Sequence, residues 1–263
     1  RSVSGALPRL ALALCVFTTC PLGASAGTRD TGGAMTIDIR SIEDFTRASA
    51  ACTELIYAES ADRATLRLAV HPGRYEGVQL TLGSRFATRP MELELVAADP
   101  ATPPVFAGGS VQLTAARLTV SGLVFTGERG AGYALHLNGY EEVRVDGVSF
   151  VDCRATVGEG AWSELGTLKL EAQADGLVAS LTDCWFVGNR GTLVSLGGQA
   201  GTRFETLELR RTALLANPGS PAIDAVMLPI PSLRGCLIDA PGPSPLLLPS
   251  FSPPFPSPSS FFL

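Results

Sequence analysis

The side chains best suited to chemistry are aspartates and arginines placed where short apolar segments end. Asp146, Asp152 and Asp183 stand beside Gly or Cys at such ends, and Arg144 and Arg190 lie close to them in the chain. An arginine can neutralise the carboxylate of an acidic sugar, and a carboxylate can then remove the adjacent proton. These five residues are therefore candidates for lyase chemistry. Each aspartate also has a structural interpretation, because Asp at a turn commonly hydrogen-bonds its own backbone.

A second group of candidates lies in the segment "RATVGEGAWSELG", residues 154–166, which contains Glu159, Trp162 and Glu164. A tryptophan on a loop can stack on a sugar ring, and the two carboxylates can bind Ca²⁺ or act as acid and base. These three residues are the candidate substrate-binding set, and no metal site is assigned. The alternative is a surface loop whose Trp162 covers an edge of the fold.

The elements that must position these residues recur at a fixed step. The segments "TLRLAV", "PMELELV", "ARLTVSG" and "EEVRVDG" place Leu68, Leu93, Leu118 and Val143 at intervals of 25 residues. Each segment alternates apolar and polar residues, as a strand with one buried face does. One strand per fixed step predicts a stack of coils, because a single coil cannot bury its own apolar face.

A second series of short apolar segments shares one sequence pattern but recurs at uneven intervals. Its apolar residues are expected to stack inside the coil at steps of 25, 36, 28 and 24, and they are Phe125, Phe150, Phe186, Leu214 and Ile238. The step of 36 predicts 11 extra residues within the 154–166 loop. The segments "GYALHLNG" and "GTLVSLGG" predict a further short strand in several coils, with Gly at the corners.

Charged residues on the other side of the strands repeat as well. Arg67, Glu92, Arg117 and Glu142 follow one another at steps of 25 with alternating sign. Strands about 4.8 Å apart would place them in a ladder along one face. Each exposed pair would contribute about 0–1 kcal/mol, so we expect the ladder to fix the register more than the stability. The alternative is that the ladder binds substrate.

The segment before the first strand completes the pattern. "IRSIEDFTRASAAC" predicts an amphipathic helix with Ser41 as N-cap and Asp44 in a capping box, and "HPGRYEG" follows the next strand. Together these features resemble the right-handed parallel β-helix of the pectate-lyase-like superfamily. The resemblance implies an all-β, single-stranded right-handed parallel β-helix over residues 36–240 with an N-terminal capping helix. It also implies a polysaccharide bound along a groove on one face.

The enzyme motifs of that superfamily are not present. The closest enzyme likeness is to polysaccharide lyases of the alginate lyase and chondroitinase B type, over the scaffold stretch from Glu94 to Phe125. Their catalytic Lys/Arg pair finds no match, because Lys169, the sole lysine, stands in "TLKLE", a sequence typical of an ordinary strand. His136, alone in "ALHLNG", is interpreted as structural. We therefore expect a non-catalytic surface or glycan-binding module, and the alternative is a lyase or hydrolase of acidic polysaccharide.

The ends of the chain and its composition concern location and partners. Residues 1–26 are typical of a signal peptide, with an apolar core and a small-x-small site ending at Ala26, and residues 27–35 are interpreted as a linker. We therefore expect a secreted, periplasmic or cell-surface protein without a membrane span, monomeric in solution. A net charge of −5 argues against a nucleic-acid partner. Residues 241–263, rich in Pro and Ser, predict a disordered tail or reflect a truncated or frame-shifted gene.

The remaining cysteines are Cys52, Cys153, Cys184 and Cys236. Their spacing matches no metal site or compact disulfide framework, and buried thiols are the simplest interpretation for most of them. Cys184 and Cys236 align at the same position two coils apart, roughly 9.6 Å, which exceeds the reach of a disulfide.

Overall fold

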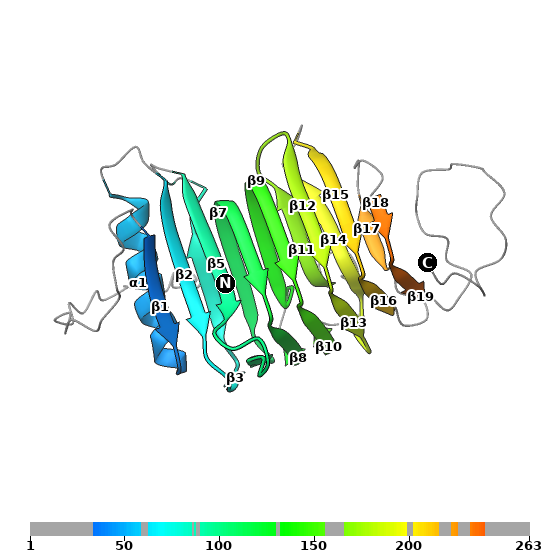
Figure 1. The fold of residues 1–263 in the computed structure, drawn as a ribbon, viewed down its shortest axis with the longest axis horizontal. Coiled ribbons are helices and arrows are strands. Elements are labelled where there is room, and N and C mark those ends of the chain that lie inside the picture. The colour runs from blue at the N-terminus through cyan, green and yellow to red at the C-terminus, as the bar shows by residue number, and fades with distance from the viewer. Residues whose placement is uncertain are drawn as a thin grey trace, which may run out of the picture.

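The chain winds into a right-handed parallel β-helix, with every strand ladder parallel (Figure 1). The computed structural model describes residues 34–58, 63–85, 87, 90–129, 132–155, 166–198, 202–215, 222–225 and 232–239. The predicted signal peptide, the centre of the 154–166 loop and the predicted tail lie outside these residues. The fold class predicted from the repeat is confirmed.

Three flat faces surround the core. Face A consists of β1 (Ala34–Ile39), β2 (Ala64–Val70), β5 (Met91–Ala97), the second halves of β7 (Ser110–Ser121) and β9 (Leu135–Asp146), β12 (Leu177–Thr182), β15 (Phe204–Arg210) and β18 (Ser232–Arg234). Face B consists of β3 (Arg74–Glu76), β6 (Val105–Ala107), β8 (Val124–Arg129), β10 (Ser149–Ala155), β13 (Trp185–Val187), β16 (Ala213–Leu215) and β19 (Leu237–Asp239). Face C consists of β4 (Gln79–Gly83), the first halves of β7 and β9, β11 (Gly166–Ala172), β14 (Thr192–Gly198) and β17 (Ile223–Ala225).

Face A confirms the predicted stack except at its first step. Leu93, Leu118 and Val143 lie opposite one another and are buried. Leu68, however, lies opposite Leu95, and it is Leu66 that lies opposite Leu93. The first step is therefore longer than predicted, and the predicted register of β2 was wrong by two. A shift of two keeps every side chain on its own side of the sheet, so the apolar pattern alone does not exclude it.

The predicted charge ladder changes with this register. Arg67 lies opposite Glu94 and forms an ion pair with it at 2.9 Å, so the predicted neighbour Glu92 was wrong. Glu92, Arg117 and Glu142 do follow one another in register. Arg117 nevertheless pairs at 3.2 Å with the carboxylate next to Glu142 in the chain, that of Glu141.

The inner column of face B is an aromatic stack. Phe125, Phe150 and Phe186 lie opposite one another and continue into Leu214 and Ile238, as predicted. The column also extends toward the N-terminus through Phe106 and Tyr75, which the sequence steps did not include. From Tyr75 to Phe186, the centroids of neighbouring rings are 4.6–5.7 Å apart and the rings are nearly parallel.

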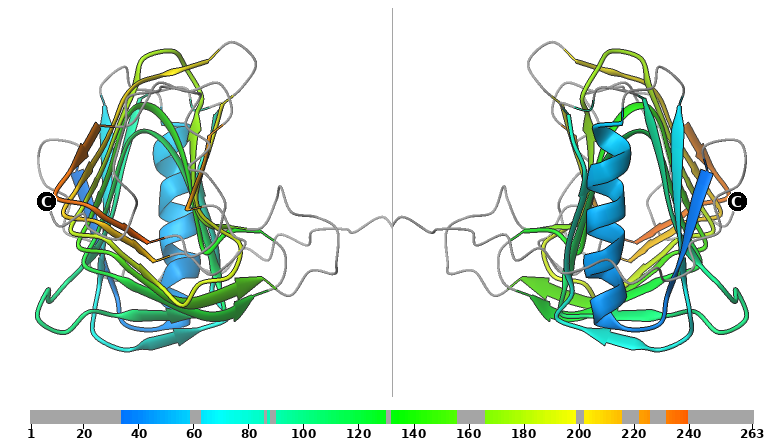
Figure 2. Two further views of the ribbon diagram at one scale, coloured as in Figure 1. Left: turned by 90° about the vertical axis from the view of Figure 1, so that its right-hand side faces the viewer. Right: turned by 90° about the vertical axis from the view of Figure 1, so that its left-hand side faces the viewer.

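The helix α1 (Ile42–Ile56) covers the N-terminal end of this stack. Its predicted capping box is present, and the Asp44 carboxylate accepts a hydrogen bond from the Ser41 N–H at 2.9 Å. Phe45 lies 5.7 Å from the ring of Tyr75 and 5.8 Å from that of Phe106. Figure 2 looks along the coil axis and shows α1 lying across the opening of the coil. The helix therefore buries apolar surface that the first coil would otherwise expose.

The corners beside face B require left-handed backbone. At the corner between faces A and B, the residues with positive φ in successive coils are Gly122, Gly147, Asp183, Arg211 and Gly235. At the corner after face B, they are Gly77, Gly108, Gly127, Asp152 and Gly188. Glycine adopts this conformation without strain, and aspartate is among the few other residues that tolerate it. Asp152 and Asp183 therefore have a structural role at their corners.

The coil between Phe150 and Phe186, where the sequence step is 36 residues, still pairs in parallel with the coil before it. Leu168 of β11 lies opposite Leu135 of β9, and Ala179 of β12 lies opposite Val143 of β9. The spacing of these partners shows that eight of the 11 extra residues lie between Phe150 and Leu168, where they were predicted. The other three lie at the corner between β11 and β12, which the sequence analysis missed.

The four cysteines of the described chain are free. Cys184 and Cys236 occupy the same column, with Thr212 between them, as their alignment predicted. Burial raises the pKa of the Cys52 and Cys153 thiols to about 11 and that of Cys184 to about 12. These thiols therefore stay protonated at neutral pH and serve as small apolar side chains.

Candidate functional site

The structure does not assemble the predicted catalytic residues into one site. Arg144 lies on the outer side of face A and pairs with Glu142 at 2.6 Å. Asp146 ends β9 at the corner before face B, and Asp183 lies at the same corner one coil further along. The Arg211 guanidinium binds both oxygens of Asp183 at 2.6 Å and lowers the pKa of that carboxyl. The charge of Asp183 is therefore compensated by Arg211.

The other candidates lie elsewhere. Asp152 and Arg190 belong to the corner after face B, where the Arg190 N–H donates to the Cys153 carbonyl at 2.9 Å. Glu159, Trp162 and Glu164 lie outside the described residues. Neither of the two pockets described below is lined by Arg144, Arg190 or any of the three candidate aspartates.

The outer side of face C instead carries a dense set of polar groups. One row across its strands consists of Thr81, Gln112, His136, Lys169, Ser195 and Asp224. The next row consists of Gly83, Thr114, Asn138, Glu171 and Gly197. The parallel ladders place His136 beside Lys169 although a whole coil of chain separates them. Both residues were interpreted as structural when each was considered alone.

Glu171 is the centre of this surface. Its carboxylate contacts His136 Nε2 at 3.1 Å and Lys169 Nζ at 3.2 Å, and it accepts a hydrogen bond from Gln173 Nε2 at 3.1 Å. Between 20% and 27% of the side-chain surface of His136, Lys169 and Glu171 remains exposed. The hydrogen bond with His136 is the main cause that lowers the pKa of Glu171 to about 2, against the effect of burial. The carboxylate is therefore charged at neutral pH and well supplied with donors.

Neighbouring groups hold this cluster in place. The amide of Asn138 donates to Thr114 Oγ1 at 3.0 Å, and both side chains are buried. The ammonium of Lys169 lies 5.6 Å from the centre of the Tyr133 ring, within the range of a cation–π contact. The same ring lies 5.9 Å from the imidazole of His136. The polar surface is thus fixed by contacts from at least three strands.

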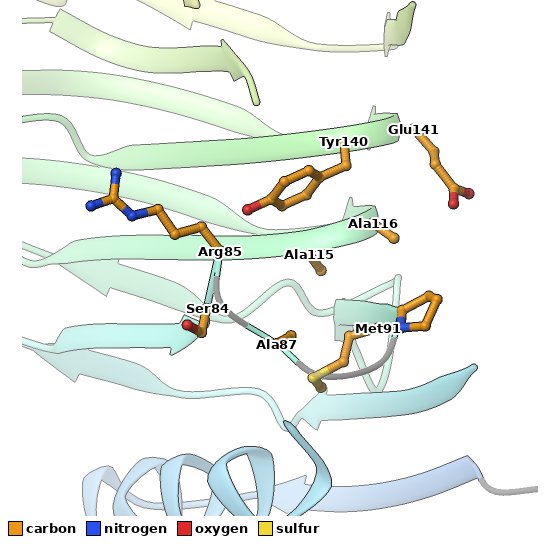
Figure 3. A pocket seen from close by; sticks show the side chains of 9 residues that line it. Ser84, Arg85, Ala87, Met91, Ala115, Ala116, Tyr140 and Glu141 are labelled. Carbon is orange, nitrogen blue, oxygen red and sulfur yellow. The ribbon is translucent and has the colours of Figure 1, made fainter. Parts of the chain in front are cut away.

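Two adjoining pockets open over this surface. The first, of about 360 Å³, is lined by Thr81, Gly83, Ser84, Arg85, Gln112, Thr114, His136, Asn138, Glu171 and Gln173. The second, of about 290 Å³, is lined by Ser84, Arg85, Ala87, Pro90, Met91, Ala115, Ala116, Tyr140 and Glu141 (Figure 3). We call them the face C pocket and the Tyr140 pocket. They share Ser84 and Arg85 and therefore lie side by side at the corner between face C and face A, and we refer to the two together as the groove.

The groove is equipped for hydrogen bonding more than for proton removal. It offers an imidazole, amides, hydroxyls and a guanidinium, in an arrangement suited to a ligand rich in hydroxyl groups. A carboxylate with a pKa of about 2 is a weak general base, since an efficient base has a pKa nearer the working pH. Glu171 therefore positions His136 and Lys169.

Two negative findings concern metals and membranes. Within the described ranges, no group of three or more His, Cys, Asp or Glu side chains is arranged to bind a metal ion. No helix in the same part of the chain has the length and apolar character needed to cross a membrane.

Comparison with known proteins adds no assignment: no protein-family model, curated protein or solved structure matches this chain.

Proposed function

We propose that this protein is a non-catalytic glycan-binding module whose groove, formed by the face C and Tyr140 pockets, binds a polysaccharide chain. The observation that carries the proposal is the Glu171 cluster, which presents His136 and Lys169 on neighbouring strands beside the face C pocket. A parallel sheet repeats such groups about every 4.8 Å, so a linear polymer can contact several coils at once. The resemblance to the pectate-lyase-like superfamily supports a carbohydrate ligand by analogy of fold.

The proposal extends to the location of the protein, which we place outside the cytoplasm. The signal-like pattern of residues 1–26 supports export, and extracellular or envelope polysaccharides would then be within reach. Polymer binding at the cell surface or outside it fits both features.

Affinity gel electrophoresis against a panel of neutral and acidic polysaccharides tests the proposal. We expect at least one polymer to retard the wild-type protein, and His136→Ala and Gln112→Ala to reduce the retardation about tenfold, since each removes a hydrogen bond to the ligand. Arg210→Gln, an exposed change on face A, serves as the matched control. Retardation by no polymer, or equal retardation of all variants, would contradict the proposal.

A polysaccharide lyase is the second candidate. It is favoured by one observation, that an imidazole, an ammonium and a carboxylate meet at hydrogen-bonding distance beside the groove. A lyase would produce an unsaturated sugar that absorbs near 235 nm. We expect no rise in absorbance with alginate, pectate or glycosaminoglycans, with or without Ca²⁺. A rise that His136→Ala abolishes would replace the binding module by the lyase.

A further inference from the structure

The polar side chains on the outer side of face C fall into two rows that differ in their internal bonding. In the row of Asn138 and Glu171, the Asn138 amide donates to a neighbouring threonine at 3.0 Å, and three side chains bind the Glu171 carboxylate. The other row contains Thr81, Gln112 and His136. Within the described chain, its one side-chain hydrogen bond is that of His136 to Glu171. This second row therefore has hydrogen-bonding capacity left for a ligand.

The ladders place the second row along the coil axis, inside the face C pocket. Thr81 lies opposite Gln112, and Gln112 lies opposite His136. All three line the pocket, on strands about 4.8 Å apart. None of them carries a fixed charge, and the cation of the next strand, Lys169, lies 3.2 Å from the Glu171 carboxylate. An uncharged row of this kind suits the successive hydroxyl groups of a neutral polysaccharide.

The contact with Glu171 defines what His136 can offer to a ligand. The hydrogen bond between them is the main cause that lowers the pKa of Glu171 to about 2, so at neutral pH the carboxylate only accepts hydrogen bonds. Its contact with His136 Nε2 at 3.1 Å therefore places the ring proton on Nε2. In the neutral imidazole, Nδ1 is then an acceptor. Nδ1 is accessible to solvent, and no described residue bonds to it.

We propose that Thr81, Gln112 and His136 form the contact edge of the groove for a neutral polysaccharide, and that His136 accepts a hydrogen bond from a ligand hydroxyl through Nδ1. A carboxylate cannot replace that hydroxyl, because it has no proton to donate. The inference rests on the proposed function, since it assumes that a glycan occupies the groove. It adds the class of the polymer and the direction of the hydrogen bond at His136, and it makes binding depend on a neutral imidazole.

Protonation of His136 reverses its role, because both ring nitrogens of an imidazolium are donors. The charged or titratable groups around the ring are Glu171 and Lys169 on β11, Tyr133 before β9, and Arg85, which lines the same pocket. The outer side of β7 at face C contributes no charged group. Because Glu171, with a pKa of about 2, keeps its charge in mildly acidic solution, a loss of binding there reports the imidazole.

Nitrogen-15 spectra of the histidine side chains test the direction of the hydrogen bond. The chain contains two histidines, so the spectrum is simple, and His71→Gln identifies the signals of His136. At neutral pH we expect a protonated Nε2 and an unprotonated Nδ1, and the Nδ1 signal should shift when mannan, xylan or a soluble β-glucan binds. A protonated Nδ1 at neutral pH would overturn the inference whether or not any polymer binds.

Affinity gel electrophoresis with the same three neutral polymers, and with alginate and polygalacturonate, tests the ligand class. We expect at least one neutral polymer to retard the wild type, and this binding to weaken about tenfold over the pH range in which the His136 signals report protonation. His136→Gln should keep most of the binding and lose its pH dependence, because an amide can donate to Glu171 and accept from the ligand without titrating. His71→Gln, which alters a second imidazole paired with Asp38 at 3.1 Å, is the matched control and should behave like the wild type.

The outcomes separate this inference from the proposed function. Retardation by acidic polymers alone, or a pH dependence that His136→Gln retains, would overturn the inference and leave the proposed function standing. Retardation by none of the polymers would contradict both.

Thr81→Val separates ligand contact from folding. Thr81 is exposed and its hydroxyl bonds to no described residue, so the substitution should leave the melting temperature unchanged. The same variant should bind the neutral polymer several-fold more weakly, since it removes a hydrogen bond to the ligand. Unchanged binding would overturn the role of Thr81 and with it the contact edge of three strands.

Discussion

Glu171 illustrates how a single side chain can organise the polar groups of a surface. Its carboxylate contacts an imidazole, an ammonium and an amide, from His136, Lys169 and Gln173. The hydrogen bond with His136 is the main cause that lowers the pKa of Glu171 to about 2, from an ordinary value of 4.5, and Lys169 adds to the effect while burial opposes it. Because the Glu171 carboxyl binds a proton less tightly in the folded chain than in the unfolded chain, its ionisation makes the stability of the fold depend on pH.

The first prediction concerns this coupling. A lowered carboxyl pKa stabilises the fold above the unfolded value and loses that effect as the pH falls through the folded value. The free energy of unfolding of the wild type should therefore exceed that of Glu171→Gln by about 1–2 kcal/mol above pH 5, a figure reduced for partial exposure. The difference should vanish between about pH 4.5 and pH 2. Denaturant unfolding at several pH values measures it.

Glu76→Gln is the control, because Glu76 belongs to an exposed pair with Arg74 and should change stability by less than about 0.5 kcal/mol. A pH-independent difference for Glu171→Gln would show that its contacts act through packing and not through charge.

Sequence reasoning missed the residues of this site for a definite reason. His136 and Lys169 become neighbours only because the step between β9 and β11 is longer than the regular step that relates β5, β7 and β9 on face A. Eight extra residues between β10 and β11 produce the difference. The segments "ALHLNG" and "TLKLE" each show alternation, so both strands were predictable, but nothing in them states their mutual register. Aligning their outward positions, His136 with Lys169 and Asn138 with Glu171, was the available signal.

At the scale of the element, the aromatic stack of face B links neighbouring coils from Tyr75 to Phe186. The rings of Phe125, Phe150 and Phe186 are fully or almost fully buried and nearly parallel. Stacked aromatic pairs contribute about 0.5–1.5 kcal/mol beyond the burial of their area. Because Phe150 stacks on Phe125 on one side and on Phe186 on the other, it links its own coil to the coil before it and to the coil after it.

The second prediction tests that coupling. Phe150→Ala should lower the free energy of unfolding by about 3–5 kcal/mol, since it leaves a cavity between two rings. Trp185→Ala, on the neighbouring strand, should cost less than about 1 kcal/mol, because the Trp185 side chain points outward and is 53% exposed. Chemical denaturation of both variants provides the comparison. Similar losses for the two would show that the column does not dominate the stability of face B.

The alternation of apolar and polar residues predicted which side of each strand is buried more reliably than it predicted which residues of the neighbouring strand lie opposite. The column from Phe125 to Ile238 was predicted in full, because a large apolar residue recurs in a similar short segment in each of these coils. The register of β2 was wrong by two, because Ala64, Leu66, Leu68 and Val70 satisfy the pattern equally well after such a shift. The aspartates of the corners were candidates for chemistry, yet positive φ at Asp152 and Asp183 explains their positions.

At the scale of the whole molecule, a stack of coils has two ends that must be covered. The helix α1 performs this task at the N-terminal end, where Phe45 packs on the rings of Tyr75 and Phe106. Without it, the core of the first coil and the adjacent strand edges would meet water, and exposed strand edges promote association.

The third prediction follows from this arrangement. Phe45→Asp places a charge against the two rings, so the melting temperature should fall and the protein should associate as its concentration rises. Size-exclusion chromatography with light scattering measures the association. Ile42→Asp is the control, since Ile42 lies on the same helix but is 48% exposed. A Phe45→Asp protein that melts and elutes like the wild type would show that the helix is dispensable.

The coil between β10 and β12 accommodates its additional residues while its ladders to both neighbours stay intact. The number of residues at a corner can therefore change without a change in the distance between neighbouring coils along the axis. A scaffold with this property permits grafting: foreign segments inserted between Ala155 and Gly166 would alter what borders face C without disturbing the layers beneath. Natural diversification of such a molecule can proceed by the same route, through lengthening of corners while the stacked interior stays the same.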